Sequence, residues 1–347
     1  MKPSQLIPFI ELALKNNRPI IITGEPGVGK SDTVSKAIEN VGYDSHVRQA
    51  VCLEPIHFTG FPCLEKDAKN PEKSHARYVP FGDTKIMMEA TKPTVFFYDD
   101  IGQGSQSVQK AMMSLLLLRE VNGQKISEHV RFIAATNRKG DGAGVGKIIQ
   151  PFISRQKAIV PFTLSVDDWI AWAHKNNVPP MVIAFIHFRG KTLLHNFDPN
   201  KVDETGNDMI QQPCPRTVTN FGEWLNLGLS IRKDREVFVG TIGEEFVREY
   251  ECFVDVFDKL GDMPKRICEG KDVDCPSDPA TLYALSSCLA QRAGDSKDWE
   301  NLSVWSKGNM PKEFQQVLLL DAEATHGEKV YNTSIYTQWV SDLKGDN

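Results

Sequence analysis

The amino-acid sequence predicts an α/β fold with a parallel sheet, followed by an all-α region. Short β-branched and aromatic runs alternate with helical patterns over residues 1–162, which is typical of strands joined by crossover helices. The first of these runs, Ile20–Thr23, leads into a glycine-rich loop and then a helix. From Ser165 onwards one helical pattern follows another, so a helical domain is expected to begin there.

Composition limits the classes of protein to consider. The chain has 347 residues, enough for two or three domains, and its net charge of −5 does not suggest a nucleic-acid-coating protein. Its seven cysteines form no C-x-x-C pair and no zinc-ligand spacing, as expected for reduced thiols. The N-terminal segment resembles neither a signal peptide nor a membrane span, and no later apolar run approaches membrane length. We therefore expect a soluble, cytoplasmic protein without membrane partners.

The loop after the first strand carries the strongest motif. The segment from Gly24 to Ser31 reads GEPGVGKS, the unbroken P-loop pattern, and predicts a P-loop NTPase core of the αβα type. Its glycines let backbone N–H groups turn toward phosphate oxygens at the N-terminus of the next helix. Lys30 is expected to neutralise the β- and γ-phosphates, and Ser31 to hold Mg²⁺. The residues expected to contact the nucleotide are Gly24, Glu25, Pro26, Gly27, Val28, Gly29, Lys30, Ser31 and Asp32.

A long segment separates the second predicted strand, Val47–Cys52, from a short predicted helix, Asp83–Ala90. This segment is too long and too rich in turn residues for a simple crossover. Its charged centre, Glu65–Arg77, is expected to be exposed. A solvated loop and a functional insertion explain these residues about equally well.

The apolar run Thr94–Tyr98 predicts a central strand that ends in two acidic residues, Asp99 and Asp100. This is the Walker B arrangement, which places the Asp99 carboxylate beside the phosphates, where it can bind the Mg²⁺ shell. Asp100 takes the position of the acid that commonly orients the attacking water. Glutamate is more usual there, so the shorter side chain implies slower hydrolysis or a small shift of the water.

A third strand end supplies an amide. After a helix at Gln106–Arg119 and a hairpin turn at Asn122-Gly123, the predicted strand Val130–Ala135 delivers Asn137 to its end. The Asn137 side chain can hydrogen-bond the γ-phosphate or the attacking water, whereas the alternative is a turn-forming asparagine. Because it follows a P-loop and an acidic strand end, we favour the functional role.

Two arginines are further candidates. Arg155 precedes the last predicted strand, Ala158–Pro161, where it could stabilise transition-state charge at the γ-phosphate of a neighbouring subunit; otherwise it is a surface arginine. Arg216 lies in the first turn of the helix that begins at Pro215 and faces whatever that helix N-terminus faces. The helices expected after Ser165 are Val166–Lys175, Pro180–Leu194, Pro215–Leu229, Gly243–Leu260, Pro279–Arg292 and Pro311–Ala324.

Together these motifs resemble those of AAA+ ATPases, and most of all the MoxR branch, the dynein-related type, over about residues 3–260. The matching stretches are RPIIITGEPGVGKS, HFTGFP, VFFYDDI with the following helix ending LLLLRE, IAATN and PRTVTNF. The resemblance implies ATP and Mg²⁺ as cofactors. It also implies a core at residues 1–162, a helical lid at 163–260 and a C-terminal helical extension at 261–347.

The resemblance further implies a role for each candidate residue. Asn137 matches sensor 1, Arg155 the arginine finger and Arg216 sensor 2, which together with Asp100 make up the expected catalytic set. Residues 61–82 are similar to the helix-2 insert and residues 119–130 to the hairpin before sensor 1, and both face the ring pore or the substrate in this clade.

The expected function is that of a ring-forming, usually hexameric ATPase that remodels a protein partner, typically one with a von Willebrand factor A domain. A less favoured alternative is an ATPase that remodels nucleoprotein complexes on DNA, with Lys139, Lys147 and the insert lysines as contacts. A third interpretation takes Asp100 as a sign that ATP serves mainly as an assembly switch with little turnover.

Overall fold

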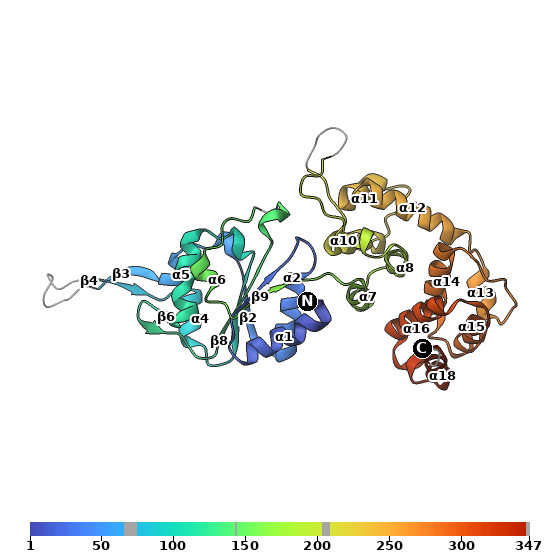
Figure 1. Cartoon of the computed structure of the whole chain (residues 1–347), viewed down its shortest axis with the longest axis horizontal. Coiled ribbons are helices and arrows are strands. Elements are labelled where there is room, and N and C mark those ends of the chain that lie inside the picture. The colour runs from blue at the N-terminus through green and yellow to red at the C-terminus, as the bar shows by residue number, and fades with distance from the viewer. Residues whose placement is uncertain (66–74, 143, 203–208, 345–347) are drawn as a thin grey trace. The chain divides into compact units, whose positions relative to one another are not determined.

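The computed structural model describes residues 1–65, 75–142, 144–202 and 209–344. The chain divides into two compact units, Met1–Leu164 and Ser165–Asn347, each of which is described by itself (Figure 1). In the part of the chain that the structure describes, no helix combines the length and apolar character needed to cross a membrane.

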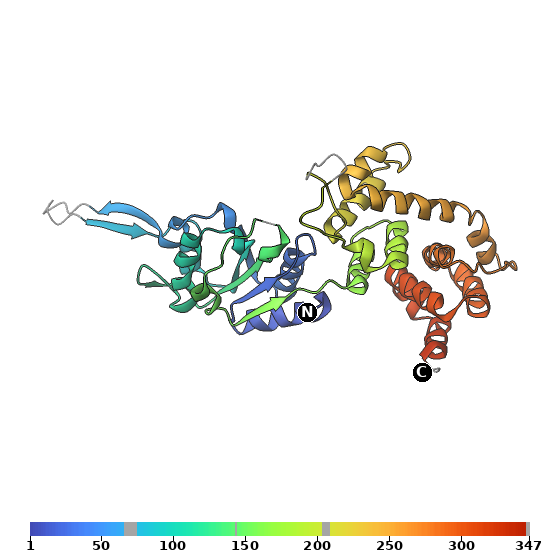
Figure 2. The same ribbon diagram turned by 45° about the horizontal axis from the view of Figure 1, so that its top comes forward.

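The first unit is built on a five-stranded parallel sheet in the order β2-β5-β8-β1-β9 (Figures 1 and 2). The middle strand is β8, and β5 is an interior strand beside it. The strands are β1 (Ile20–Thr23), β2 (Asp44–Gln49), β5 (Thr94–Asp99), β8 (Val130–Thr136) and β9 (Ala158–Pro161).

Helices cover both faces of this sheet, because its interior strands are apolar on both sides. Along β5, for example, Val95 and Phe97 belong to one hydrophobic core while Phe96 and Tyr98 belong to the other. The first core is completed by α1 (Pro3–Lys15) and α2 (Lys30–Val41). The second is completed by α3 (Ile56–Thr59), α4 (Asp83–Glu89), α5 (Gln106–Leu117) and α6 (Gln150–Ile153). The αβα prediction is confirmed.

The second strand lies three residues earlier than the sequence predicted. The structure places β2 at Asp44–Gln49 and forms a 3₁₀ turn, η1, over Ala50–Cys52. Because β2 is an edge strand with mostly exposed side chains, it lacks the continuous apolar run that locates buried strands. Its position follows instead from parallel pairing with β5, in which Asp44 lies opposite Thr94.

The long segment before α4 contains an antiparallel hairpin, β3 (Phe61–Glu65) and β4 (His75–Val79), rather than only an irregular loop. The hairpin extends away from the sheet (Figures 1 and 2), and nearly all its side chains are exposed. An ion pair of 2.9 Å between Arg77 Nε and Glu65 Oε2 joins its strands. Residues 66–74, the rest of the predicted charged centre, lie outside the described residues.

A second, smaller hairpin follows α5. Its strands, β6 (Glu120–Val121) and β7 (Gln124–Lys125), are joined by Asn122 and Gly123, which both have the positive φ that such a tight turn requires. Arg119, at the base, donates hydrogen bonds to the carbonyls of Ser127 and Val130. Burial, and then the charge of Arg131, lower the pKa of Arg119 from its ordinary value.

The second unit is helical, as expected from Ser165 onwards. Its helices are α7 (Val166–Lys175), α8 (Pro180–Arg189), α9 (Lys191–Leu194), α10 (Pro215–Asn226), α11 (Arg235–Ile242), α12 (Glu244–Asp258), α13 (Met263–Cys268), α14 (Pro279–Arg292), α15 (Ser296–Asn309), α16 (Lys312–His326), α17 (Glu328–Tyr331) and α18 (Ser334–Lys344). The predicted helix Pro180–Leu194 is wrong, because Gly190, with φ of 63°, ends α8 and starts a separate turn. The sequence also missed α11, α13, α15, α17 and α18.

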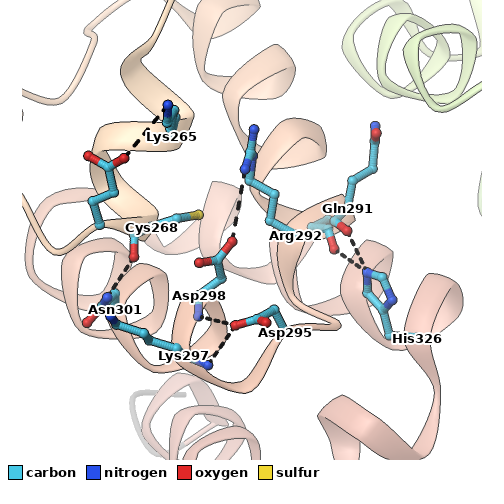
Figure 3. A network of polar contacts seen from close by, with 11 residues as sticks. Lys265, Cys268, Gln291, Arg292, Asp295, Lys297, Asp298, Asn301 and His326 are labelled. Atoms are coloured by element: carbon cyan, nitrogen blue, oxygen red, sulfur yellow. Dashed lines mark hydrogen bonds and ion pairs between the residues drawn. The ribbon is translucent and has the colours of Figure 1, made fainter.

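Aromatic packing and polar contacts hold these helices together. The rings of Phe185 on α8 and Phe221 on α10 both pack edge-on against Tyr250 of α12, with centroids 5.3 and 4.9 Å apart. Figure 3 shows polar contacts between α13, α14, α15 and α16, including a 2.6 Å hydrogen bond from Asn301 Nδ2 to the Cys268 carbonyl. Burial raises the pKa of the Cys268 thiol to about 12.

Candidate active site

Three strands deliver polar residues to one edge of the sheet. In parallel strands β1, β5 and β8, the carboxyl ends lie at the same edge, where α/β proteins place their ligands. The P-loop follows β1, Asp99 is the last residue of β5, and Asn137 follows β8 directly. The sheet therefore brings together side chains whose hydrogen bonds join residues 37 to 107 positions apart in the sequence.

The P-loop has the backbone that phosphate binding requires. Gly27 and Gly29 have φ of 72° and 97°, and Gly29 precedes the first residue of α2. A Cβ on Gly24 would lie 3.0 Å from Cβ of Phe162, so this position also has little room for a side chain. The loop thus leads directly into a helix N-terminus, which favours an anion.

Lys30 is a buried cation within this loop. Its side chain is 6% exposed, and Nζ donates to the carbonyls of Gly24 and Glu25 at 2.9 and 2.7 Å and to Asn137 Oδ1 at 2.7 Å. These acceptors hold the ammonium over the loop. The residue thus has the position and charge expected of the P-loop lysine.

Ser31 and Asp99, the two residues expected to bind the metal, are hydrogen-bonded to each other. Ser31 Oγ donates to Asp99 Oδ2 at 2.6 Å, and the backbone N–H of Asp100 donates to the other carboxylate oxygen at 3.0 Å. A hydroxyl and a carboxylate fit Mg²⁺, which takes oxygen ligands and usually binds one or two carboxylates together with substrate phosphates. The two residues would hold the ion beside the P-loop.

Asp100 and Asn137 are joined by a hydrogen bond. Asn137 Nδ2 donates to Asp100 Oδ1 at 3.2 Å, while Asn137 Oδ1 accepts from Lys30. Asp100 has φ of 50°, a left-handed conformation that costs about 1–2 kcal/mol for a non-glycine residue. Such strain is typical of functional sites, and here it turns the chain sharply at the end of β5.

Thr136 and Gly102 are positioning residues that the sequence reasoning missed. The hydroxyl of Thr136 accepts from the Gly102 N–H at 3.2 Å and donates to the Asn137 carbonyl at 3.0 Å. A Cβ on Gly102 would lie 2.4 Å from that hydroxyl, so only glycine allows this approach. Their signal was a threonine directly before Asn137 and a glycine two residues after Asp100.

The two predicted arginines lie in different units of the chain. Arg155 is half-buried just after α6, where it donates from Nη1 to the carbonyl of Pro151 while its Nε is buried without a hydrogen-bond partner among the described residues. Among the residues that the structure describes, no hydrogen bond or ion pair links Arg155 to the P-loop, Asp99, Asp100 or Asn137. Arg216 is exposed in the first turn of α10, in the second unit.

The arrangement is suited to phosphoryl transfer. Bound ATP and Mg²⁺ would supply the transferred phosphoryl group and its charge-neutralising metal. Lys30 would then balance phosphate charge, Ser31 and Asp99 would hold the ion, and Asp100 would accept a hydrogen bond from a water aligned for attack. Asn137 would keep the Asp100 carboxylate in place. These individual roles stay predictions.

Similar solved structures have low sequence identity. RuvB, the Holliday junction branch migration motor of Thermotoga maritima, is 13% identical with a TM-score of 0.39, over 88% of this chain and 86% of that chain. NtrX from Brucella abortus is 15% identical with a TM-score of 0.39, over 92% of this chain and 67% of that chain.

Comparison of the sequence with known proteins gives a relative and a family. Midasin of Giardia intestinalis is 27% identical over 190 residues, which make up 51% of this chain and 4% of midasin. This chain therefore spans a small fraction of the length of that relative. Residues 20–164, which hold every strand of the sheet and every site residue except Arg216, match the family described as "ATPase family associated with various cellular activities (AAA)". Residues 20–164 are thus similar to an AAA domain, which supports a P-loop ATPase that hydrolyses ATP.

Proposed function

We propose that this ATPase works as a ring, a homohexamer in the simplest case, in which Arg155 of one subunit completes the site of the next. The observation that carries the proposal is the placement of cations. Lys30 lies inside the P-loop and Arg138 pairs with Glu25 of this loop at 3.5 Å, whereas Arg155 contacts the carbonyl of Pro151. Charge developing in phosphoryl transfer would therefore be stabilised by a neighbour's arginine, which can contribute about 10³-fold or more in rate. A head-to-tail interface that closes into a ring supplies that geometry.

Within this function we place the chain in the MoxR branch, as a remodeller of protein partners that include a von Willebrand factor A domain protein. The support is the motif resemblance together with two hairpins in the expected places, β3–β4 and β6–β7. Exposed Phe61, Leu64 and Tyr78 on β3–β4 give that hairpin apolar side chains for contact with a client. Arg216 acts as sensor 2 from a lid at residues 163–260, with 261–347 as an extension.

Rate measurements at a series of protein concentrations test the ring. Specific ATPase activity should rise with concentration as rings form. Arg155→Ala should keep ATP affinity and lose most hydrolysis, whereas Arg232→Ala, an exposed arginine paired with Asp255 and Asp258 in the second unit, should hydrolyse normally. Adding duplex DNA should leave the wild-type rate unchanged, and a large stimulation would favour nucleoprotein remodelling instead.

Mixing two inactive variants tests the arginine more directly. A Lys30→Ala subunit still offers its own Arg155, and an Arg155→Ala subunit still has an intact P-loop. The mixture should regain activity that neither variant has alone. A concentration-independent wild-type rate together with an inactive mixture would show that one chain contains the complete site.

A further inference from the structure

Gln109 is a buried glutamine that the active-site motifs leave unexplained. It lies on α5 with 1% of its side chain exposed, and the neighbouring Val108 and Met112 belong to the apolar core. Burying an amide costs free energy unless both its oxygen and its nitrogen find partners. A buried glutamine in an otherwise apolar setting therefore depends on the bonds it makes.

Those bonds connect two loops. Gln109 Nε2 donates to the carbonyl of Gly104 at 3.1 Å, and Oε1 accepts from the backbone N–H of Ile149 at 2.9 Å. Gly104 ends η3 (Ile101–Gln103), the short turn that starts at Asp100. Ile149 is the residue that precedes α6. The side chain therefore joins the loop after Asp100 to the start of the segment that leads to Arg155.

A backbone hydrogen bond joins the same two loops as the Gln109 side chain. The backbone N–H of Gly146 donates to the carbonyl of Gly102 at 2.8 Å. Beyond Ile149, Phe152 of α6 is fully buried in the same core as Met112, and the N–H of Arg155 donates to the Phe152 carbonyl at 3.3 Å. A continuous path of hydrogen bonds and packed side chains thus runs from Asp100 to Arg155.

We propose that Gln109 is a positioning residue that couples the Asp100 loop to the Arg155 segment. A shift of the loop at the nucleotide carboxylates is passed through the Gln109 amide to α6, and so to the arginine that a subunit presents to its neighbour. The inference rests on the proposed function, because Arg155 has a catalytic partner only in a ring. It adds a structural path by which the nucleotide bound at one site affects the arginine presented to the neighbouring site.

The complementing pair of variants separates the two ends of this route. In a mixture of Lys30→Ala with Arg155→Ala subunits, the first donates the arginine and the second carries the working P-loop. Gln109→Leu is introduced into one of the two at a time. In the donor it tests the Arg155 end, and in the acceptor it tests the Asp100 end. Restored activity should fall about tenfold or more in each arm, since small misplacements of catalytic groups cost that much.

ATP affinity, measured with a fluorescent analogue, should change less than about twofold in these variants, because the hydrogen bonds of Gln109 go to Gly104 and Ile149 and not to the P-loop. Gln109→Glu changes one end of the bridge: it keeps the acceptor for Ile149 and places a carboxylate oxygen, which cannot donate, against the Gly104 carbonyl. It should reduce activity in the acceptor arm. A loss confined to one arm with Gln109→Leu would mean that Gln109 positions one residue only, and the coupling would be wrong.

Gln315 provides a matched control. It is also buried, with 6% exposed, and also bridges two segments: Nε2 donates to the Met310 carbonyl at 2.8 Å, and Oε1 accepts from Trp339 Nε1 at 2.6 Å. Gln315→Leu in the same two backgrounds should lower thermal stability and leave the restored activity unchanged. An equal loss from both glutamine variants would make the effect one of general stability and overturn the inference.

Hydrogen exchange tests the coupling without the mixture of variants. Its result therefore remains informative if the mixture is inactive, an outcome that counts against the proposed function. Adding Mg²⁺ with a non-hydrolysable ATP analogue to the wild type should slow amide exchange in residues 101–104 and in residues 145–153. In Gln109→Leu only the first segment should respond. An equal response of the second segment in this variant, or none in the wild type, would overturn the proposal.

Discussion

Asn137 Nδ2 donates a 3.2 Å hydrogen bond to Asp100 Oδ1, so the amide after β8 holds the second acid after β5. The other end of the amide accepts from Lys30 Nζ at 2.7 Å, which fixes its orientation. The oxygen faces the cation and the nitrogen faces the anion. One neutral side chain thus links the phosphate-binding lysine to the acid expected to orient water.

Asn137→Asp tests this orientation. The change keeps an oxygen acceptor for Lys30 but replaces the donor to Asp100 with a second carboxylate oxygen, which repels it. We expect ATP affinity to stay within a few-fold of wild type and kcat to fall by about tenfold or more. Single-turnover assays and nucleotide titrations measure the two effects separately. A normal kcat in this variant would show that the hydrogen bond to Asp100 has no role in hydrolysis.

Lys30→Ala should abolish ATP binding. The variant removes the buried positive charge and leaves the Gly24 and Glu25 carbonyls without their donor. Calorimetric titration with Mg-ATP should show no heat of binding, while the circular dichroism spectrum stays that of the folded chain. Lys36→Ala, at an exposed lysine of the same helix paired with Glu39, is the control and should bind normally. Unchanged affinity in Lys30→Ala would refute the site assignment.

Most of the site could be predicted because its residues follow buried strands. The apolar runs at β1, β5 and β8 locate those strands, and in a parallel sheet their ends meet at one edge. The hydrogen bonds between Lys30, Asn137 and Asp100 could not be predicted, since they depend on the left-handed turn at Asp100. Gln109 was missed for a related reason: periodicity places it on a core helix without saying which backbone groups it meets.

The fold was predictable where burial dominates and not elsewhere. The edge strand β2 has few apolar residues, so its pattern gave the wrong limits. Helices α11 and α15 were missed because their polar and apolar residues do not separate into a strong stripe. By contrast, α7 begins and ends where the sequence indicated, since Ser165 caps it and its apolar face is regular.

Asp321 should make the stability of the second unit depend on pH. It is 2% exposed on α16, and its Oδ1 lies 3.0 Å from His174 Nε2 and 3.4 Å from His187 Nε2. Burial alone would raise the pKa of the carboxyl, but the hydrogen bonds and charges of the two histidines outweigh it and lower the pKa below its ordinary 3.8. The stabilisation is therefore fully present above pH 3.8 and is lost as the pH falls through the lower folded pKa.

Urea unfolding of the wild type and of Asp321→Ala measures this effect. Removing one partner of a buried pair costs about 3–5 kcal/mol near neutral pH, and the difference between the two proteins should shrink as the solution is acidified. Asp342→Ala, which removes an exposed carboxylate paired with Lys307, should cost about 1 kcal/mol or less. A difference that stays constant down to about pH 2 would show that the pKa of Asp321 is the same in the folded and the unfolded chain.

Asp100 is the remaining question, because glutamate is more usual at its position. Its carboxylate is held by Asn137 and its backbone by the strained turn, so the group is fixed although its side chain is short. Asp100→Asn removes the negative charge that would orient water and accept its proton, while the P-loop and Asp99 stay intact. We therefore expect this variant to bind ATP and Mg²⁺ normally, to hydrolyse ATP about a hundredfold more slowly, and to accumulate as assembled rings in ATP. Asp100→Glu restores the missing methylene and should keep or raise the rate.

Sedimentation velocity with and without ATP, together with phosphate-release assays, measures assembly and turnover on the same samples. If Asp100→Asn hydrolyses ATP at the wild-type rate, the water is oriented by another group; if the wild type itself assembles in ATP and shows no turnover, the nucleotide acts as an assembly switch.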